Sequence, residues 1–127
     1  MGIERKYTVE IVETSREFTA KEKVMLKDIS KAQSLNELSK DNDFIFKPSD
    51  WAILKIHNEM SENKDYTVYV IFDTDGNAFT TSSENFFDTF LDIVGDMQGV
   101  TEEWAISVYQ LDSKKRSGSK FLTCSII

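Results

Sequence analysis

The amino-acid sequence predicts a mostly β domain with one main helix. Several short segments alternate apolar and polar residues, which indicates strands, and one segment carries aromatic residues at helical spacing. The chain has 127 residues, of which 40% are hydrophobic and 29% charged. That size is typical of one domain, so we expect a single domain over residues 1–127. No apolar run approaches the ~20 residues of a membrane helix, and no secretory signal is visible, so we expect a cytoplasmic protein with no membrane contact.

The first third of the chain predicts one strand and two short helical segments. Apolar and polar side chains alternate over residues 7–12, which indicates a strand. Thr19 and Glu22 form a capping-box pattern, in which each side chain can accept a hydrogen bond from the backbone N–H of the other. The helix that they open should end near Lys27. Residues 34–40 predict a further helical turn.

The middle of the chain predicts three strands. Alternation of apolar and polar residues marks residues 51–57, 66–72 and 77–81. The segment 73–76 between the last two reads Asp-Thr-Asp-Gly, a turn signal, because Asp bonds its own backbone and Gly76 tolerates a positive φ. These strands therefore include a hairpin.

The main helix is predicted over residues 83–94. Ser82 or Ser83 can cap its N-terminus, and Gly95 is a suitable residue to follow its last turn. Because helical spacing indicates a buried face, we interpret its apolar stripe as core rather than as a cofactor site. The stripe consists of Phe86, Phe87, Phe90, Leu91 and Val94.

A final hairpin is predicted by two alternating segments, residues 104–111 and 120–127. The loop between them, residues 112–119, contains Gly118, which can adopt a left-handed conformation. Five or six antiparallel strands with a helix before the last hairpin fit an OB-like, partly open barrel. In that fold the loops before strand two and between strands four and five bind oligonucleotides. An α+β antiparallel sheet packed on one helix accounts for the same strands and is the alternative.

The charge is unevenly distributed along the chain. The net charge is −7, and residues 65–112 contain ten acidic residues without any Lys or Arg. A basic group then follows within seven residues. A net acidic protein does not usually bind polyanions over its whole surface, but a local patch can do so. The patch predicts either a solvated turn or a phosphate-binding loop; it consists of Lys114, Lys115, Arg116 and Lys120.

No motif of catalysis is visible in the sequence. His57 is the only histidine and Cys124 the only cysteine, so a structural zinc site with four Cys or His ligands is excluded. Cys124 alternates with apolar residues in the last strand and is expected to be a buried, inert thiol. The five glycines are scattered and form no phosphate cradle. We therefore expect no enzyme, no catalytic residues, no metal and no cofactor.

Nucleic-acid binding needs cations for phosphates and flat rings for bases. The basic group supplies the cations, and the predicted strands supply candidate stacking rings. Alternation alone does not decide which face of each strand lies outside. The candidate nucleic-acid-binding residues are Lys114, Lys115, Arg116, Lys120, Tyr69, Tyr109, Trp51 and Lys55.

Three motifs in the second half of the chain carry a resemblance to a known family. Residues 69–82 contain the turn and a Gly-x-x-Phe-x-Thr return strand, residues 86–90 contain the aromatic helix, and residues 114–124 contain the basic turn followed by Phe-x-x-Cys. Together they resemble small bacteriophage single-stranded DNA-binding proteins of Gram-positive hosts. The resemblance covers roughly residues 66–127.

The resemblance implies an OB fold, no catalysis, and a role in phage DNA replication or recombination by coating exposed strands in the host cytoplasm. Single-stranded DNA is then the main partner, and further copies of the chain or replication and recombination proteins are candidate partners. Bacterial single-stranded DNA-binding proteins dock partners through an acidic tail, whereas this chain ends in Ser125, Ile126 and Ile127. The alternative hypothesis is a phage-encoded acidic interaction or inhibitor module that acts on a host protein.

Replacing Lys114, Lys115 and Arg116 together with Ala should weaken oligo(dT) binding. Each neutralised phosphate on a single strand contributes about 0.7 to the slope of log affinity against log salt concentration, so the slope should flatten by up to about 2. A salt series on wild type and triple variant measures this, with circular dichroism as the folding control. An unchanged slope would make the patch a solvated turn.

Overall fold

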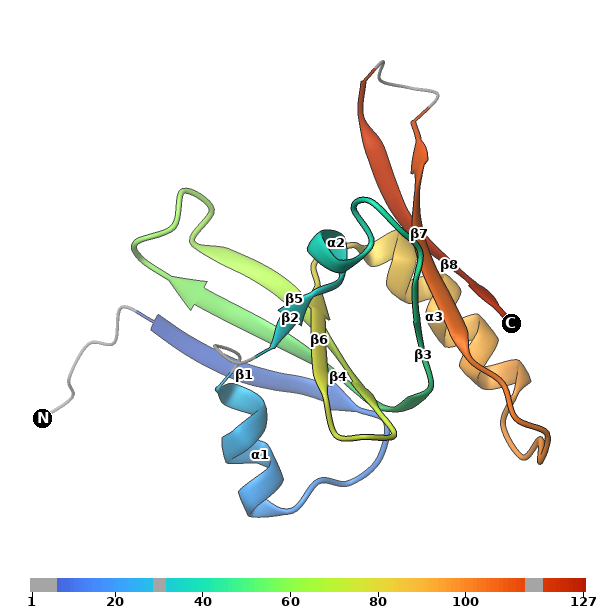
Figure 1. Cartoon of the computed structure of the whole chain (residues 1–127). Coiled ribbons are helices and arrows are strands. Elements are labelled where there is room, and N and C mark those ends of the chain that lie inside the picture. Colours follow the sequence, from blue (N-terminus) through green and yellow to red (C-terminus); the bar gives the residue numbers. More distant parts are fainter. Residues whose placement is uncertain (1–6, 29–31, 114–117) are drawn as a thin grey trace, which may run out of the picture.

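The computed structural model describes residues 7–28, 32–113 and 118–127. Over these ranges the chain alternates strands with three helices, of which one is long (Figure 1). In chain order the elements are β1 (Tyr7–Thr14), α1 (Ala20–Lys27), β2 (Gln33–Ser34), α2 (Leu35–Leu38), β3 (Phe44–Phe46), β4 (Pro48–Asn58), β5 (Asp65–Asp73), β6 (Ala78–Thr81), α3 (Glu84–Asp96), β7 (Ile106–Asp112) and β8 (Lys120–Ile126).

The strands form two sheets. The larger has the order β1-β4-β5-β6-β2, and the smaller has the order β3-β7-β8. Every pairing is antiparallel except the two-residue contact between β2 and β6. The two sheets do not close into a barrel. The prediction of a mostly β chain with antiparallel sheets and one main helix is confirmed at this level.

One continuous stretch of chain belongs to both sheets. β3 pairs with β7, and one residue later the chain enters β4, which pairs with β1 and β5. The corner is bonded to the β5–β6 turn: the Thr74 N–H donates to the Lys47 carbonyl at 3.0 Å, and the Ser49 hydroxyl donates to the Asp73 carbonyl at 3.0 Å. Pro48 begins β4, a position where the missing N–H of proline is tolerated.

The aromatic side of α3 fills the space between the two sheets. The Ser83 side chain caps the helix by accepting a hydrogen bond from the Phe86 N–H at 3.2 Å. The three phenylalanines of the stripe are buried in one cluster with residues of both sheets, which confirms the interpretation of the stripe as core. The cluster contains Leu35, Phe46, Ile71, Phe79, Phe86, Phe87, Phe90, Ile106, Val108, Leu122 and Cys124.

A second core lies on the opposite face of the larger sheet. β4 and β5 contribute the sheet side of this core, and it is covered by Phe18, which precedes the N-cap of α1, and by Leu26 in the last turn of α1. The larger sheet therefore buries side chains on both faces, with α1 on one and α3 on the other. The core residues from β4 and β5 are Ala52, Leu54, Ile56, Val68 and Val70.

Local signals in the sequence are confirmed at several positions. Thr19 and Glu22 form the expected capping box. Gly76 and Gly118 adopt positive φ values of 87° and 83°, as the two hairpin turns require. Ser83 is the N-cap of the main helix. Among the described residues, no helix is long and apolar enough to cross a membrane.

Two expectations are wrong. Gly95 does not follow the helix but lies inside it, since α3 continues to Asp96 with Met97 as its C-cap; the left-handed glycine after the helix is Gly99, with φ 81°. The sequence also gives no prediction of β3, which is only three residues long and too short to show an alternation. Its pairing with β7 turns one predicted hairpin into a three-stranded sheet.

Phe90→Ala should destabilise the fold by ~3–5 kcal/mol, because the ring is 1% exposed between the two sheets and its loss leaves a cavity. Urea denaturation measures the change. Met60→Ala, at a side chain that is 82% exposed, is the matched control and should stay within about 0.5 kcal/mol of wild type. A Phe90→Ala loss below about 1 kcal/mol would contradict a core role.

Candidate nucleic-acid interface

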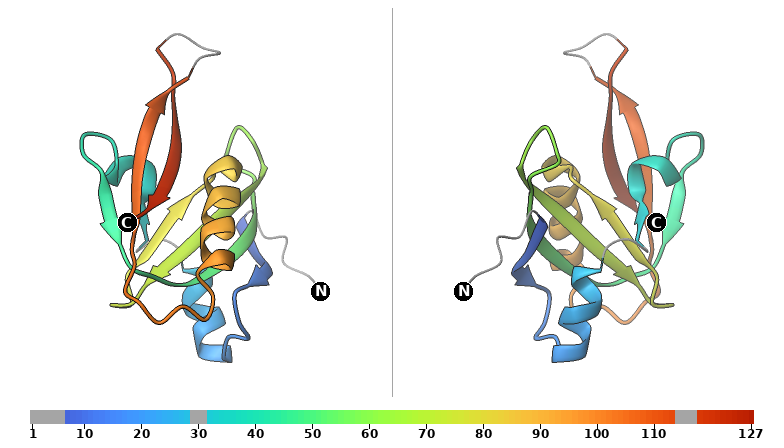
Figure 2. Two further views of the ribbon diagram at one scale, coloured as in Figure 1. Left: turned by 90° about the vertical axis from the view of Figure 1, so that its right-hand side faces the viewer. Right: turned by 90° about the vertical axis from the view of Figure 1, so that its left-hand side faces the viewer.

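The β7–β8 hairpin projects beyond the rest of the molecule (Figures 1 and 2). Its register is continuous from Ile106 opposite Ile126 to Asp112 opposite Lys120. The Ser113 N–H donates to the Ser119 carbonyl at 2.8 Å and closes the ladder beneath the loop. The predicted basic loop joins these two strands in the sequence. Lys120 is exposed at the start of β8, whereas Lys114, Lys115 and Arg116 lie outside the described residues.

The smaller sheet has one buried and one solvent-facing side. Its inner side packs on α3. Strand alternation places the neighbouring residues on the outer side, which we call the hairpin face. Large apolar side chains are exposed there: Ile45 is 56% exposed, Leu111 45% and Phe121 44%. The hairpin face consists of Ile45, Tyr109, Leu111, Phe121, Thr123 and Ser125.

Two aromatic rings belong to the hairpin face. The Tyr109 hydroxyl lies 2.6 Å from the Ser125 hydroxyl on the neighbouring strand, so the ring leans across the sheet. Tyr109 pairs with Thr123, and Leu111 pairs with Phe121, so Tyr109 and Phe121 are diagonal neighbours on adjacent strands. The hydrogen bond to Ser125 inclines the Tyr109 ring away from Phe121, which leaves two separate flat surfaces on which a base can stack.

The hairpin face carries no charge of its own, and cations lie at its borders. None of its six residues is Asp, Glu, Lys, Arg or His. Lys47, just after β3, is exposed and lies 3.7 Å from Glu103. Lys120, opposite Asp112, lies at the other end. A neutral aromatic surface bordered by cations is the combination that single-stranded nucleic acids require.

Two of the predicted stacking rings lie elsewhere. Trp51 and Tyr69 point to the α3 side of the larger sheet, where both contact Phe87, with ring centroids 5.5 and 4.3 Å away. Burial raises the pKa of Tyr69, and the charges of Glu84 and Asp88 raise it further. Both rings are half-buried and support α3, and the acidic side chains beside Tyr69 disfavour a phosphate there.

Lys55 lies on the same side of β4, farther along the strand. It is exposed and pairs with Glu10 of β1 and Thr67 of β5. The structure therefore groups Lys120 and Tyr109 on the hairpin and places Trp51, Tyr69 and Lys55 on the larger sheet. Phe121 was missing from the predicted set, although its alternation with Leu122 could have placed it beside Tyr109.

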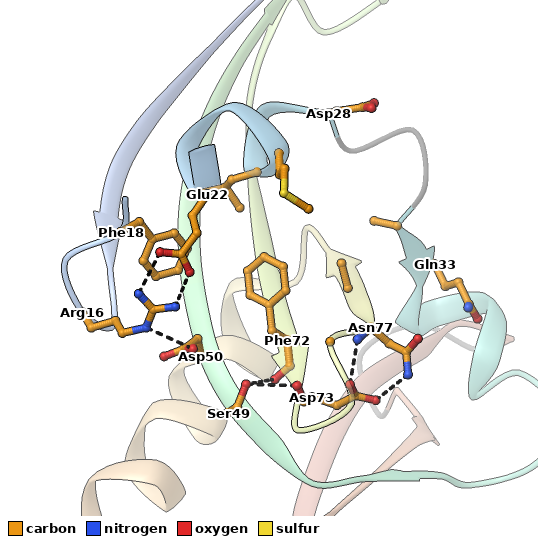
Figure 3. A pocket seen from close by; sticks show the side chains of 15 residues that line it. Arg16, Phe18, Glu22, Asp28, Gln33, Ser49, Asp50, Phe72, Asp73 and Asn77 are labelled. Atoms are coloured by element: carbon orange, nitrogen blue, oxygen red, sulfur yellow. Dashed lines mark hydrogen bonds and ion pairs between the residues drawn. The ribbon is translucent and has the colours of Figure 1, made fainter. Parts of the chain in front are cut away.

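On the α1 side of the larger sheet, Phe18 and Leu26 pack on β4 and β5. A cavity of about 510 Å³ remains between α1 and the β5–β6 turn, with Phe18 and Phe72 pointing into it (Figure 3). The Arg16 guanidinium bonds both Glu22 and Asp50 at one side, and its hydrogen bond lowers the pKa of Glu22 to about 2. The ionisable lining comprises one arginine and four acids, Glu22, Asp28, Asp50 and Asp73. This cavity therefore suits a phosphate poorly.

The lone cysteine and the lone histidine lie in different sheets. Burial raises the pKa of the Cys124 thiol to about 11, so at neutral pH it is protonated and a poor nucleophile. Both ring nitrogens of His57 are engaged, Nδ1 with Asp65 and Nε2 with Glu59, each at 2.8 Å. Neither residue is arranged to activate the other.

Comparisons with known proteins add no family to these observations. No family model, no curated protein sequence and no solved structure matches this chain. The function is therefore inferred from the residues of this chain and from the hairpin face.

His57 should make stability fall as the pH rises through the neutral range. Hydrogen bonds to Asp65, and then to Glu59, raise the pKa of His57, so its contribution is complete below about pH 6.5 and is lost as the pH rises through the folded-state pKa. The urea midpoint should decline over this range in wild type and stay flat in His57→Gln. Identical profiles for the two proteins would show that the contacts do not persist in solution.

Proposed function

We propose that this chain is a single-stranded DNA-binding protein, with the hairpin face as its base-stacking surface and the basic loop as its phosphate contact. The observation that carries the proposal is the uncharged pair of outward-facing rings, half-buried Tyr109 and exposed Phe121, on two strands that are joined in sequence by the densest basic group of the chain. Aromatic stacking with nearby cations binds single strands without sequence preference.

The topology supports an OB-like interpretation of the fold. The stretch β3–β4, then β5, β6, β7 and β8, provides five strands, and α3 lies between the third and fourth of them, as in a partly open Greek-key barrel. Because β3 pairs with β7, the first strand of this set meets the fourth. The loops that bind oligonucleotides in such folds then correspond to residues 59–64 and 113–119.

The resemblance of residues 66–127 to small bacteriophage proteins supports a role in phage DNA replication or recombination, carried out in the host cytoplasm. In this role the protein coats exposed strands and performs no chemistry, without a cofactor. The protonated Cys124 thiol and the doubly bonded His57 are consistent with that assignment. Replication and recombination proteins are its proposed partners beside DNA.

A second candidate function is favoured by α3. Its exposed side carries an acidic row of Glu84, Asp88, Asp92 and Asp96, and the helix contains no basic residue. Such a surface could present carboxylates to a basic host protein, in the manner of an interaction or inhibitor module. Under this alternative the protein would bind no oligonucleotide, so a DNA titration separates the two functions.

Phe121→Ala and Tyr109→Ala should each weaken oligo(dT) binding. Removal of one stacking ring costs about 1–3 kcal/mol, which corresponds to about 5- to 150-fold in affinity. Fluorescence titration at fixed salt measures the affinities. Tyr7→Ala is the matched control, because Tyr7 is 46% exposed on β1, in the other sheet, and should leave the affinity unchanged.

The two ring variants and the basic-loop variant report on different contacts. Loss of a ring should lower the affinity while leaving its salt dependence unchanged, because stacking releases no counterions. Equal weakening by Tyr7→Ala and Phe121→Ala would remove the hairpin face as the binding surface. Absence of oligo(dT) binding by wild type would leave the acidic interaction module as the better function.

A further inference from the structure

We propose that the chain associates with further copies of itself head to tail, with the basic outer side of α1 docking on the acidic outer side of α3 of the next copy. The two helices expose complementary surfaces that no contact within the described part of the chain covers. The association extends the proposed function, since it would align copies along a strand, but its geometry is independent of DNA.

The outer side of α1 is both apolar and basic. Only Leu26 of this helix is buried, whereas Val24 is 71% exposed and Met25 64%. Lys21, Lys23 and Lys27 are exposed around them, and none of the three forms an ion pair among the described residues. Exposed apolar side chains surrounded by cations on a short helix indicate a docking surface. The only acid of the helix, Glu22, is already bonded to Arg16.

The outer side of α3 offers the complementary surface. Glu84, Asp88, Asp92 and Asp96 follow one another at intervals of four residues and are all exposed. Like charges at this spacing destabilise a helix, so a row of cations from a partner would relieve their repulsion. Gly95 lies beside the row, and a Cβ built on it would meet nothing within 4 Å. The helix therefore offers a shallow site for an apolar side chain next to its carboxylates.

The spacing of charges on the two helices matches. Lys23 and Lys27 are four residues apart, as are Asp88 and Asp92, and each interval corresponds to a rise of about 6 Å. Two ion pairs can therefore form together when the helices lie side by side. Val24, one residue after Lys23, would then lie between the levels of the two ion pairs.

The position of the two helices determines the kind of assembly. α1 covers one face of the larger sheet and α3 covers the other, and in Figure 1 they lie on different sides of the molecule. The basic outer side of α1 and the acidic outer side of α3 therefore face away from each other. A single partner cannot contact both surfaces of one copy. The contact is heterologous, and copies add in a row rather than as a closed two-fold dimer.

A charge-reversal pair tests this contact in the absence of DNA. In the first variant, Lys21, Lys23 and Lys27 become Glu; in the second, Asp88, Asp92 and Asp96 become Lys. Sedimentation velocity is measured over a concentration series in low salt and again in about 1 M salt, where the Debye length is about 3 Å. Circular dichroism confirms that both variants are folded.

We expect wild type to sediment faster with increasing concentration in low salt and to return to the monomer value in high salt. Each variant alone should associate at least about tenfold more weakly, because reversal turns exposed attractions into repulsions. An equimolar mixture of the variants should associate again, since each supplies the charge that the other needs at both contacts. Neutral variants, Lys→Gln and Asp→Asn at the same positions, should each weaken association alone, and their mixture should form pairs but no longer rows, because only one of the two contacts between the variants keeps both native charges. They serve if a reversed helix unfolds.

Three results would overturn the proposal: a wild type that stays monomeric throughout, a mixture that sediments no faster than its components, or an α1 variant that associates as wild type does. All three are read without oligonucleotide. Failure of self-association is thus distinct from failure of single-stranded DNA binding, which is decided by oligo(dT) titration.

Discussion

The fold depends on the corner at which β3 becomes β4. Residues 44–58 leave one sheet and enter the other within a single residue, so the angle of this corner sets how the two sheets diverge. Hydrogen bonds from Thr74 to Lys47 and from Ser49 to Asp73 tie the corner to the β5–β6 turn. Asp73 in turn accepts hydrogen bonds from the N–H groups of Asp75 and Asn77 within that turn. The β5–β6 turn thus stabilises both its own hairpin and the β3–β4 corner between the two sheets.

Two sheets that diverge from a shared strand leave a wedge of space that must be filled. α3 fills it with Phe86, Phe87 and Phe90, whose rings contact both sheets and each other. Because the helix occupies the inner side of β7 and β8, the alternate residues of these strands face solvent. The exposed rings on the hairpin face are therefore a consequence of the packing inside: each buried position of the hairpin requires an outward neighbour.

The sequence predicted the elements whose signals are local. The stripe of α3, the capping box at Thr19 and the glycines of the two hairpin turns each lie within a few residues of the structure that they specify. β3 was not predicted because three residues are too few to show the apolar–polar alternation of a strand. It is a strand because it pairs with β7, about sixty positions later. For the same reason, alternation could not decide that Tyr69 turns toward Phe87 while Tyr109 turns outward. Those orientations depend on which face α3 covers, which is long-range information.

The arrangement is compatible with the proposed binding of DNA by an acidic chain. The net charge is −7, yet the carboxylates of α3 lie behind the smaller sheet as seen from the hairpin face. Packed layers are about 10 Å apart, which exceeds the Debye length of about 8 Å at physiological ionic strength. Repulsion that reaches a phosphate at the hairpin face through solvent would thus be largely screened. At low salt the screening fades and the acids of α3 oppose the approach of the polyanion. Association through α1 and α3 would remove part of that opposition by neutralising the acids, so self-association and strand binding would favour each other.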